Sequence, residues 1–529
     1  MLMTPSQTCS TCGSQLDYAT LFKLGPGPCK LMEGGPCALC LELEEFDREC
    51  QAILASLTKR RRGIMQRINQ RHDPFIQRLP LELASKVFSF CIPQQVFDSN
   101  PVQISLLWDT LKSSNITPFN IVLGSICQSW RRIAWSTPDL WSTLPIRLHR
   151  WYESTRVDLT LEWLSRSAQI PLDVSVAYDL RRISERLTQE NVGLWKPLIN
   201  IINSCSSRWR TFVVDVPQLV YSYIVGNGKP TSILKRLKIG PAYSFRRFLT
   251  GFSLANARPT PTELVCSTMP LRLIDIDWSN LTTVSIKDLF LGECLVLLQW
   301  APQLVTFQIG RLKLGQYEVL PDLAPTTHNT VKCLNILGLD KTSTAHEPLD
   351  FLILPSLVEL FYDSQHNSLE NVLAFLQRSG CSLTELHIVG DASDHLPEIT
   401  MAPGLQALEG LEYHGDLDSC LQCLDRPTNR HDSPILPNLH KLTIRPDGPR
   451  GLSGLADLFL SRPMRTLSIQ LTYPVDEWVD KETALRLQDL VRKGHDITIM
   501  GVPEGENGEE RDLLPWIIES STSETMTTH

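Results

Sequence analysis

A short apolar frame recurs at nearly constant intervals through the second half of the chain. The frame reads apolar, two spacers, apolar, one spacer, apolar, as in Leu304-Val-Thr-Phe-Gln-Ile309 and Leu383-Thr-Glu-Leu-His-Ile388. It begins at residue 234 and then at residues 304, 331, 357, 383, 408, 439 and 464. Alternating apolar residues indicate a short strand, and helical segments such as 371–378 lie between the frames. The chain should therefore repeat a unit of one strand and one helix.

The frames from residue 304 to residue 464 begin 25 to 31 residues apart. Intervals of this length match a leucine-rich repeat, in which neither the strand nor the helix buries its apolar side until a neighbouring repeat stacks on it. The fold class predicted is α/β, with an irregular leucine-rich-repeat solenoid over residues 149–500 and a loop-rich interruption over 240–270. A helix at 482–491 and a strand at 496–500 would cap it. The strand residues predicted to point outward are Lys235, Gln308, Glu385, His387, Lys441 and Arg465.

Residues 75–141 carry two apolar helical stripes ahead of the repeats. The first runs through Leu79, Leu83, Val87 and Phe90, with Pro80 suited to the first helical position. The second follows Thr117-Pro118 and places Val122, Ile126, Trp130 and Ile133 along one helix face. Both stripes predict helices that pack against a partner surface.

The ordered combination of Leu-Pro-x-Glu-Leu, Val-Phe, Ile-Cys-x-x-Trp-Arg-x-Ile-Ala and Thr-Pro-x-Leu-Trp resembles the F-box motif. The chain is similar to fungal (basidiomycete-type) F-box proteins with a leucine-rich-repeat-like C-terminal region. The resemblance implies a helical F-box domain over 73–148, with an insertion at 93–117 between its first two helices. It implies that these residues bind the adaptor or form the F-box core: Leu79, Pro80, Leu83, Val87, Phe88, Cys127, Trp130, Ile133, Leu140 and Trp141.

The resemblance also implies a function. The F-box would bind a Skp-type adaptor, which joins it to a cullin-RING (SCF) ubiquitin ligase, while the repeats hold an unknown target protein. The chain would then be a non-catalytic subunit of the ligase, and its partners would supply the chemistry. Two alternatives stay open. One is a leucine-rich-repeat scaffold acting outside ubiquitination, and the other is a helical subdomain whose apolar faces are only core.

Composition and charge limit the classes of protein to which this chain can belong. A chain of 529 residues that is 42% hydrophobic can form more than one core. Its net charge of −8 argues against general nucleic-acid binding, and no apolar run approaches the roughly 18 residues of a membrane-spanning helix. The N-terminus lacks a secretory signal, so we expect an intracellular protein, in the cytoplasm, the nucleus or both. The sequence contains neither a nucleophile elbow nor a phosphate-binding loop, and it predicts no catalytic residue and no required cofactor.

The segment 1–40 is rich in cysteine. Cys9 and Cys12 form one Cys-x-x-Cys pair, and Cys37 and Cys40 form another. Two such pairs can bind one tetrahedral zinc ion, so these four thiols are a candidate structural zinc site. The alternative is a reduced segment without metal. A third pair, Cys420 and Cys423, lies in a helical part of a repeat and is better explained as core.

Residues 41–72 have an apolar stripe with steps of three and four, which indicates an amphipathic helix or short coiled coil. This helix could dimerise or pack on the rest of the chain. The basic run Lys59-Arg-Arg-Arg62 favours a solvated face, although with the cysteines it also allows a nucleic-acid module. The acidic segment 501–529 is predicted to be disordered.

Overall fold

The computed structural model divides into two compact units, one of helices up to residue 140 and one that begins with Trp141. Cys9, Cys12 and the predicted insertion 93–117 lie outside the described residues. The structure describes residues 7–8, 15–16, 37–72, 79–91, 119–148, 154–178, 189–229, 233–241, 250–256, 258–267, 269–313, 325–338, 348–363, 370–389, 396–415, 417–425, 435–446, 454, 457–458, 466–470, 481–501 and 511–512.

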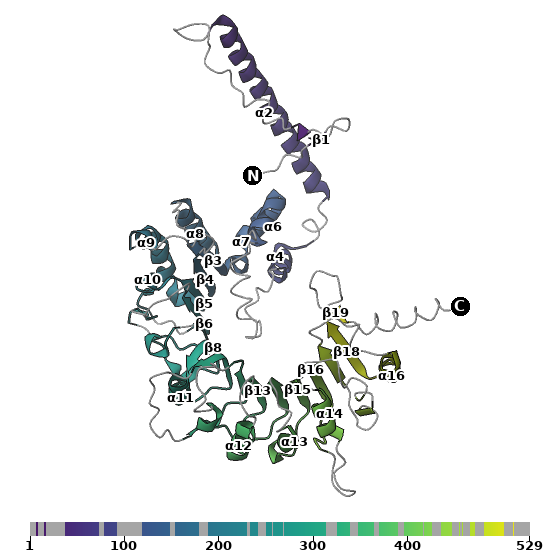
Figure 1. Ribbon diagram of the computed structural model, residues 1–529. Helices are drawn as coiled ribbons and strands as arrows, with labels where there is room; N and C mark the ends of the chain where they lie inside the picture. The colour runs from purple at the N-terminus through teal and green to yellow at the C-terminus, as the bar shows by residue number, and fades with distance from the viewer. Residues whose placement is uncertain are drawn as a thin grey trace, which may run out of the picture. The chain divides into compact units, whose positions relative to one another are not determined.

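The first unit is helical, and its longest helix covers the segment predicted at 41–72 (Figure 1). A two-stranded antiparallel ribbon, β1 (Gln7–Thr8) with β2 (Gln15–Leu16), precedes it. The described helices of this unit are α2 (Ala38–His72), α4 (Leu81–Phe90), α6 (Phe119–Ile126) and α7 (Gln128–Ser136).

The second unit is built on one 15-stranded sheet in which each strand pairs with the next strand of that sheet along the chain. All pairs are parallel except the last, β18 with β19. Figure 1 shows the strands following one another in chain order. The strands are β3 (Thr143–Leu148), β4 (Leu172–Tyr178), β5 (Trp209–Val216), β6 (Arg236–Pro241), β7 (Glu263–Cys266), β8 (Thr283–Phe290), β9 (Thr306–Lys313), β11 (Cys333–Ile336), β13 (Glu359–Asp363), β14 (Glu385–Val389), β15 (Gly410–Gly415), β16 (Lys441–Pro446), β17 (Thr466–Gln470), β18 (Asp496–Gly501) and β19 (Arg511–Asp512).

The apolar residues of the frame stand in register across the sheet. Leu334, for example, pairs with Phe307 on one side and with Leu360 on the other, and all three are buried. Each fully buried side chain of this size stabilises the fold by about 1.5–3 kcal/mol relative to exposure. The row that contains them is Leu144, Val174, Phe212, Leu237, Leu264, Val284, Phe307, Leu334, Leu360, Leu386, Leu411, Leu442, Leu467 and Ile497.

Helices connect several pairs of the parallel strands, because a parallel pair needs a crossover connection, whereas two 3-10 helices lie between β7 and β8. Figure 1 shows α9, α11, α12 and α14 on one side of the sheet. In α12, the side chains of Phe375 and Leu376 are buried in the same core as the strand rows. The helices of this unit are α8 (Ser154–Arg166), α9 (Gln189–Ser204), α10 (Gln218–Tyr221), α11 (Leu291–Trp300), α12 (Glu370–Ser379), α13 (Leu396–Thr400), α14 (Leu417–Asp425) and α16 (Lys481–Arg492). The protein is thus mixed α/β.

The sheet extends beyond the predicted repeat region at both ends. It starts with β3, inside the segment 73–148 predicted as F-box, because Trp141, Leu144 and Ile146 form a frame with an aromatic first residue. At the other end β19 pairs with β18, so part of the tail predicted to be disordered is a strand. The predicted interruption at 240–270 contains β7, whose buried Leu264 continues the apolar row of Leu144. Its buried Cys266 pairs with Ile239 and Ile286 in a second apolar row, two residues further along the strands.

A close backbone approach requires glycine at position 404. A Cβ atom on Gly404 would lie 2.6 Å from the carbonyl oxygen of Cys381, and the Gly404 carbonyl accepts a 2.9 Å hydrogen bond from the N–H of Leu383. We predict that Gly404→Ala lowers the free energy of unfolding by about 1–3 kcal/mol. Gly193→Ala, in α9 with open space around it, should raise stability by about 1 kcal/mol. Urea unfolding of both variants tests whether the free energy of unfolding falls in Gly404→Ala and rises in Gly193→Ala.

Candidate functional site

The helices of the first unit bury one set of the predicted F-box residues. Phe88 of α4 and Ile133 of α7 are buried, and the rings of Phe88 and Trp130 lie 4.9 Å apart. The Thr137 hydroxyl, just beyond α7, links the two helices through hydrogen bonds of 3.0 Å to the Ser85 hydroxyl and 2.8 Å to the Ile133 carbonyl. Leu140 is also buried. These residues form the inner packing of α4 against α7.

The second predicted stripe is divided between two helices. Cys127 has an extended backbone, with φ −152° and ψ 170°, so α6 ends before it and α7 begins after it. The Trp130 N–H donates a 3.4 Å hydrogen bond to the Cys127 Sγ, which satisfies a backbone donor in the first turn of α7. Cys127 is therefore a helix cap, and the single continuous helix expected here is wrong.

The apolar stripe of α4 faces outward. Leu83 is 52% exposed and Val87 is 38% exposed, so the stripe predicted to pack against a partner surface is open in this chain. Leu79 is half-buried, and Pro80 is exposed and serves as the N-cap residue instead of the first helical residue. Other large apolar residues on α4, α6 and α7 are exposed as well: Leu81, Phe90, Ile121, Val122, Ile126 and Trp135. We call these eight residues the outer apolar set: Leu81, Leu83, Val87, Phe90, Ile121, Val122, Ile126 and Trp135.

Trp141, also predicted as an F-box residue, belongs to the second unit. Its ring meets the ring of Trp163 edge-on at 4.9 Å between centroids, and the guanidinium of Arg166 lies over it at 4.6 Å. The Trp163 indole N–H donates a 3.0 Å hydrogen bond to the Trp141 carbonyl. Trp141 therefore anchors the first strand of the sheet to α8.

The candidate zinc site is described only in part. Cys37 and Cys40 lie at the start of α2, where both are partly exposed. Within the described ranges, no group of three or more His, Cys, Asp or Glu residues could hold a metal ion. Since Cys9 and Cys12 lie outside those ranges, zinc binding by the four thiols stays a prediction. Cys420 and Cys423 of α14 are buried, as expected for core cysteines.

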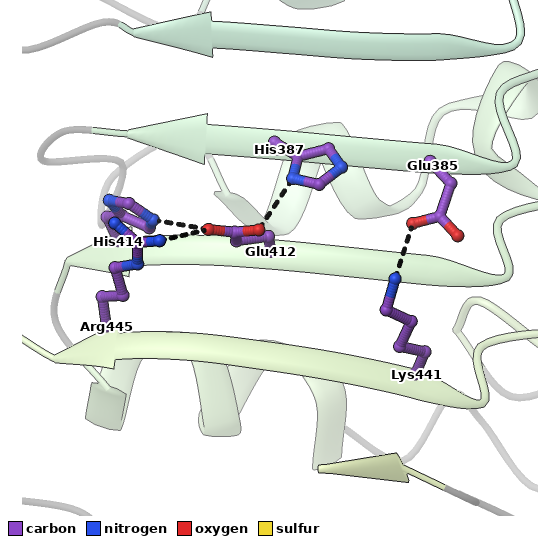
Figure 2. Close-up of polar contacts among 6 residues, drawn as sticks. All are labelled: Glu385, His387, Glu412, His414, Lys441 and Arg445. Atoms are coloured by element: carbon purple, nitrogen blue, oxygen red, sulfur yellow. Dashed lines mark hydrogen bonds and ion pairs between the residues drawn. The ribbon is translucent and has the colours of Figure 1, made fainter. Parts of the chain in front are cut away.

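A cluster of charged side chains lies on three neighbouring strands, centred on Glu412 of β15 (Figure 2). His387 of β14 and Glu412 are register partners, and the His387 Nδ1 lies 2.9 Å from the Glu412 Oε2. His414 approaches the other carboxylate oxygen with its Nε2 at 2.9 Å, and the Arg445 Nη2 of β16 lies 3.4 Å from that same oxygen. We call Glu412, His387, His414 and Arg445 the Glu412 cluster.

The surroundings of Glu412 favour its charged form. Burial alone would raise the pKa of this carboxyl, but hydrogen bonds from His387 and His414, together with the nearby Arg445 charge, hold the pKa well below its usual range. The cluster continues from β14 onto the neighbouring strand β13. Phe361 of β13 stacks on the His387 ring at 5.8 Å. The arrangement fixes imidazole, guanidinium and aromatic groups in a row, which suits recognition by hydrogen bonds and stacking.

Glu412→Gln should destabilise the sheet by about 1–3 kcal/mol at neutral pH, because it removes the carboxylate that His387, His414 and Arg445 contact. A carboxyl whose pKa is depressed in the folded state contributes stability above its unfolded pKa and loses it as pH falls. The difference in free energy of unfolding between the wild-type chain and the Glu412→Gln variant should therefore become smaller below about pH 4.3. Urea unfolding at several pH values measures it. Glu385→Gln is the matched control, since the Glu385 carboxylate lies 3.8 Å from the Lys441 Nζ in a partly exposed pair. A destabilisation of similar size there would contradict the prediction.

The residues predicted to point outward from the strands differ in how exposed they are. Lys235 and Lys441 are exposed, Glu385 and His387 are half-buried, and Arg465 lies outside the described residues. Gln308 is only 8% exposed, contrary to the prediction, since it stands in a row of close neighbours between Ser285 and Asn335. Sequence reasoning missed Glu412, although it occupies the same frame position as His387 and could have been found there.

A search of known protein families gives no model that matches the chain, and a search of curated proteins gives no significant match. Among the helices in the described parts of the chain, none is both long and apolar enough to cross a membrane.

Proposed function

We propose that the chain is a substrate receptor of a cullin-RING (SCF) ubiquitin ligase, in which the helical unit binds a Skp-type adaptor and the sheet unit holds a target protein. The proposal rests on the resemblance of residues 75–141 to the F-box motif. The chain would contribute proximity and choice of target, without catalytic residues of its own. It would act inside the cell, in the cytoplasm, the nucleus or both.

The observation that carries the proposal is the outer apolar set. Phe88, Ile133 and Ala134 already form the buried packing between α4 and α7, yet Leu83 and Val87 remain exposed on the other side of α4. Single exposed apolar residues are ordinary, but several large ones on three consecutive helices are typical of a protein-binding surface. The resemblance places two of these same residues, Leu83 and Val87, among those that bind the adaptor or form the F-box core.

We further propose that the sheet unit is an irregular leucine-rich-repeat solenoid. Pairing of each strand with the next, and two apolar rows in constant register, support this proposal. The target would bind the polar side of the strands, where the Glu412 cluster and Phe361 provide hydrogen-bonding and stacking groups. Such a surface recognises a folded protein or an extended segment by several weak contacts spread over neighbouring strands.

Co-purification of the full chain with a Skp-type adaptor tests the first half of the proposal. The wild-type chain should retain the adaptor, and combined alanine substitution of Leu79, Pro80 and Trp130 should abolish retention. Leu159→Ala, at a residue of α8 that is 66% exposed, is a control that should change nothing. A folded wild-type chain that does not retain the adaptor would favour a repeat scaffold acting outside ubiquitination.

Affinity capture of the chain with and without a proteasome inhibitor tests the second half. A target that is degraded through this receptor should accumulate on it when the proteasome is blocked. The triple-alanine chain keeps the sheet unit and should still bind the target, but the bound amount should not respond to the inhibitor. Bound proteins whose amounts do not respond to the inhibitor would contradict a role in degradation.

A further inference from the structure

The long helix α2 separates its charges into two halves. Between residues 38 and 54 the charged residues are Glu42, Glu44, Glu45, Asp47, Glu49 and one arginine, Arg48. Between residues 55 and 71 every charged residue is basic: Lys59, Arg60, Arg61, Arg62, Arg67 and Arg71. The change of sign falls at Ala55, which is also the midpoint of the helix Ala38–His72.

An exposed apolar stripe crosses both halves of α2. Phe46, Ile53 and Leu57 are each more than half exposed, and Leu43 and Ile64 are more than 40% exposed. Together with the half-buried Cys50, these residues follow steps of three and four, the spacing of the seam of a two-stranded coiled coil. Among the seam positions from Leu43 to Arg67, Arg60 and Arg67 are the two that are not apolar. The helix therefore presents a seam whose apolar side chains are exposed over most of its length.

We propose that α2 pairs with α2 of a second copy of this chain in antiparallel orientation, centred on Ala55. In this arrangement Phe46 meets Ile64 of the other copy, and Ile53 meets Leu57. The acidic segment 42–49 of each copy lies beside segment 61–68 of the other, which contains Arg61, Arg62 and Arg67. Opposite charges along the edges of a coiled coil set the orientation of its helices.

The two arginines in the seam distinguish the antiparallel pair from a parallel one. In a parallel pair Arg60 would face Arg60 and Arg67 would face Arg67, and the acidic halves would also lie side by side. In the antiparallel pair Arg60 lies opposite Cys50 and beside Glu49 of the other copy. Arg67 lies opposite Leu43 and beside Glu42. Each seam arginine thus meets a carboxylate, and both like-charge contacts disappear.

The mass of the full chain in solution tests whether α2 pairs at all. Light scattering at micromolar concentration should give twice the 59.8 kDa of one chain. Ile53→Glu combined with Leu57→Glu should halve that mass, because both residues lie at the centre of the seam. Ala55→Glu, on the outward side of the same turn, should leave the dimer intact. A monomeric wild-type chain, or a dimer that survives the double substitution, would overturn the proposal.

Disulfide formation under mild oxidation tests the orientation and does not depend on the substitutions above. In the antiparallel pair the two Cys50 residues lie about 15 Å apart along the helix axis, too far for a disulfide, which needs Cα atoms within about 7 Å. Arg60→Cys should create a disulfide between position 60 of one copy and Cys50 of the other, identified by mass spectrometry of the linked peptides. A link between the two Cys50 residues in the wild-type dimer would instead show a parallel pair and overturn the proposal.

Discussion

Phe307→Ala should lower the free energy of unfolding of the sheet unit by about 3–5 kcal/mol, the range expected when a fully buried aromatic side chain is truncated. Phe307 is 1% exposed and stands in the apolar row between Val284 of β8 and Leu334 of β11. Its removal leaves a cavity between strands that pair only with their neighbours, so no distant part of the chain can fill it. Urea or thermal unfolding measures the loss.

Phe290→Ala is the matched control for this prediction. Phe290 ends β8, the strand beside Phe307, and is 43% exposed, so the same truncation removes far less buried surface. We expect a change below about 1 kcal/mol there. Equal losses in the two variants would mean that the in-register apolar rows do not determine the stability of the sheet.

Leu83→Glu combined with Val87→Glu should weaken binding of a Skp-type adaptor by about 30-fold or more, if the outer apolar set is the docking surface. Apolar anchors in protein interfaces each contribute about 2 kcal/mol or more, and carboxylates in their place would be buried without partners. Because both residues are exposed in the chain by itself, the substitutions should leave its fold intact. Titration of the purified adaptor into each chain measures the affinity.

The control for the fold is far-UV circular dichroism of the double variant, which should match that of the wild-type chain. A control for charge is Lys86→Glu, which adds a carboxylate on the same helix near Phe90. It should weaken adaptor binding less than the double variant does. An unchanged affinity of the Leu83 and Val87 double variant would mean that the adaptor binds a surface other than the outer apolar set.

Much of the sheet could be predicted from the frame, because period-two apolar residues at constant intervals specify a repeated buried strand. Leu304, Phe307 and Ile309 show the principle, since all three are buried as the pattern predicts. The frame did not reveal strands whose first frame position is aromatic or not apolar. Trp141 was assigned to the helical motif ahead of the sheet, yet it packs on Trp163 and opens the first strand.

The helical unit was harder to predict, because periodicity finds an apolar face without saying what covers it. The stripe through Leu83 and Val87 has the spacing of a core face, but Ala84 and Phe88, one residue further on, are the ones that pack inward. Helical spacing also continues across Cys127, where the chain is extended. A residue that caps a helix through its sulfur has no distinct signal in the sequence.

The Glu412 cluster depends on register between strands that are 25 to 31 residues apart in the sequence. His387, Glu412 and Arg445 come from three repeats, and only the observed pairing of β14, β15 and β16 brings them together (Figure 2). The frame predicts which residues face away from the apolar rows. It does not predict which of them meet, because irregular repeat lengths shift the loops between them.

Calorimetric titration of the full chain with a purified Skp-type adaptor is the decisive test of the receptor function. We expect a saturable complex of one adaptor per chain, with an affinity in the micromolar range or tighter, and its loss when Leu83 and Val87 are replaced by glutamate. A folded chain that takes up no adaptor, or a complex that forms equally well with the substituted chain, would contradict it.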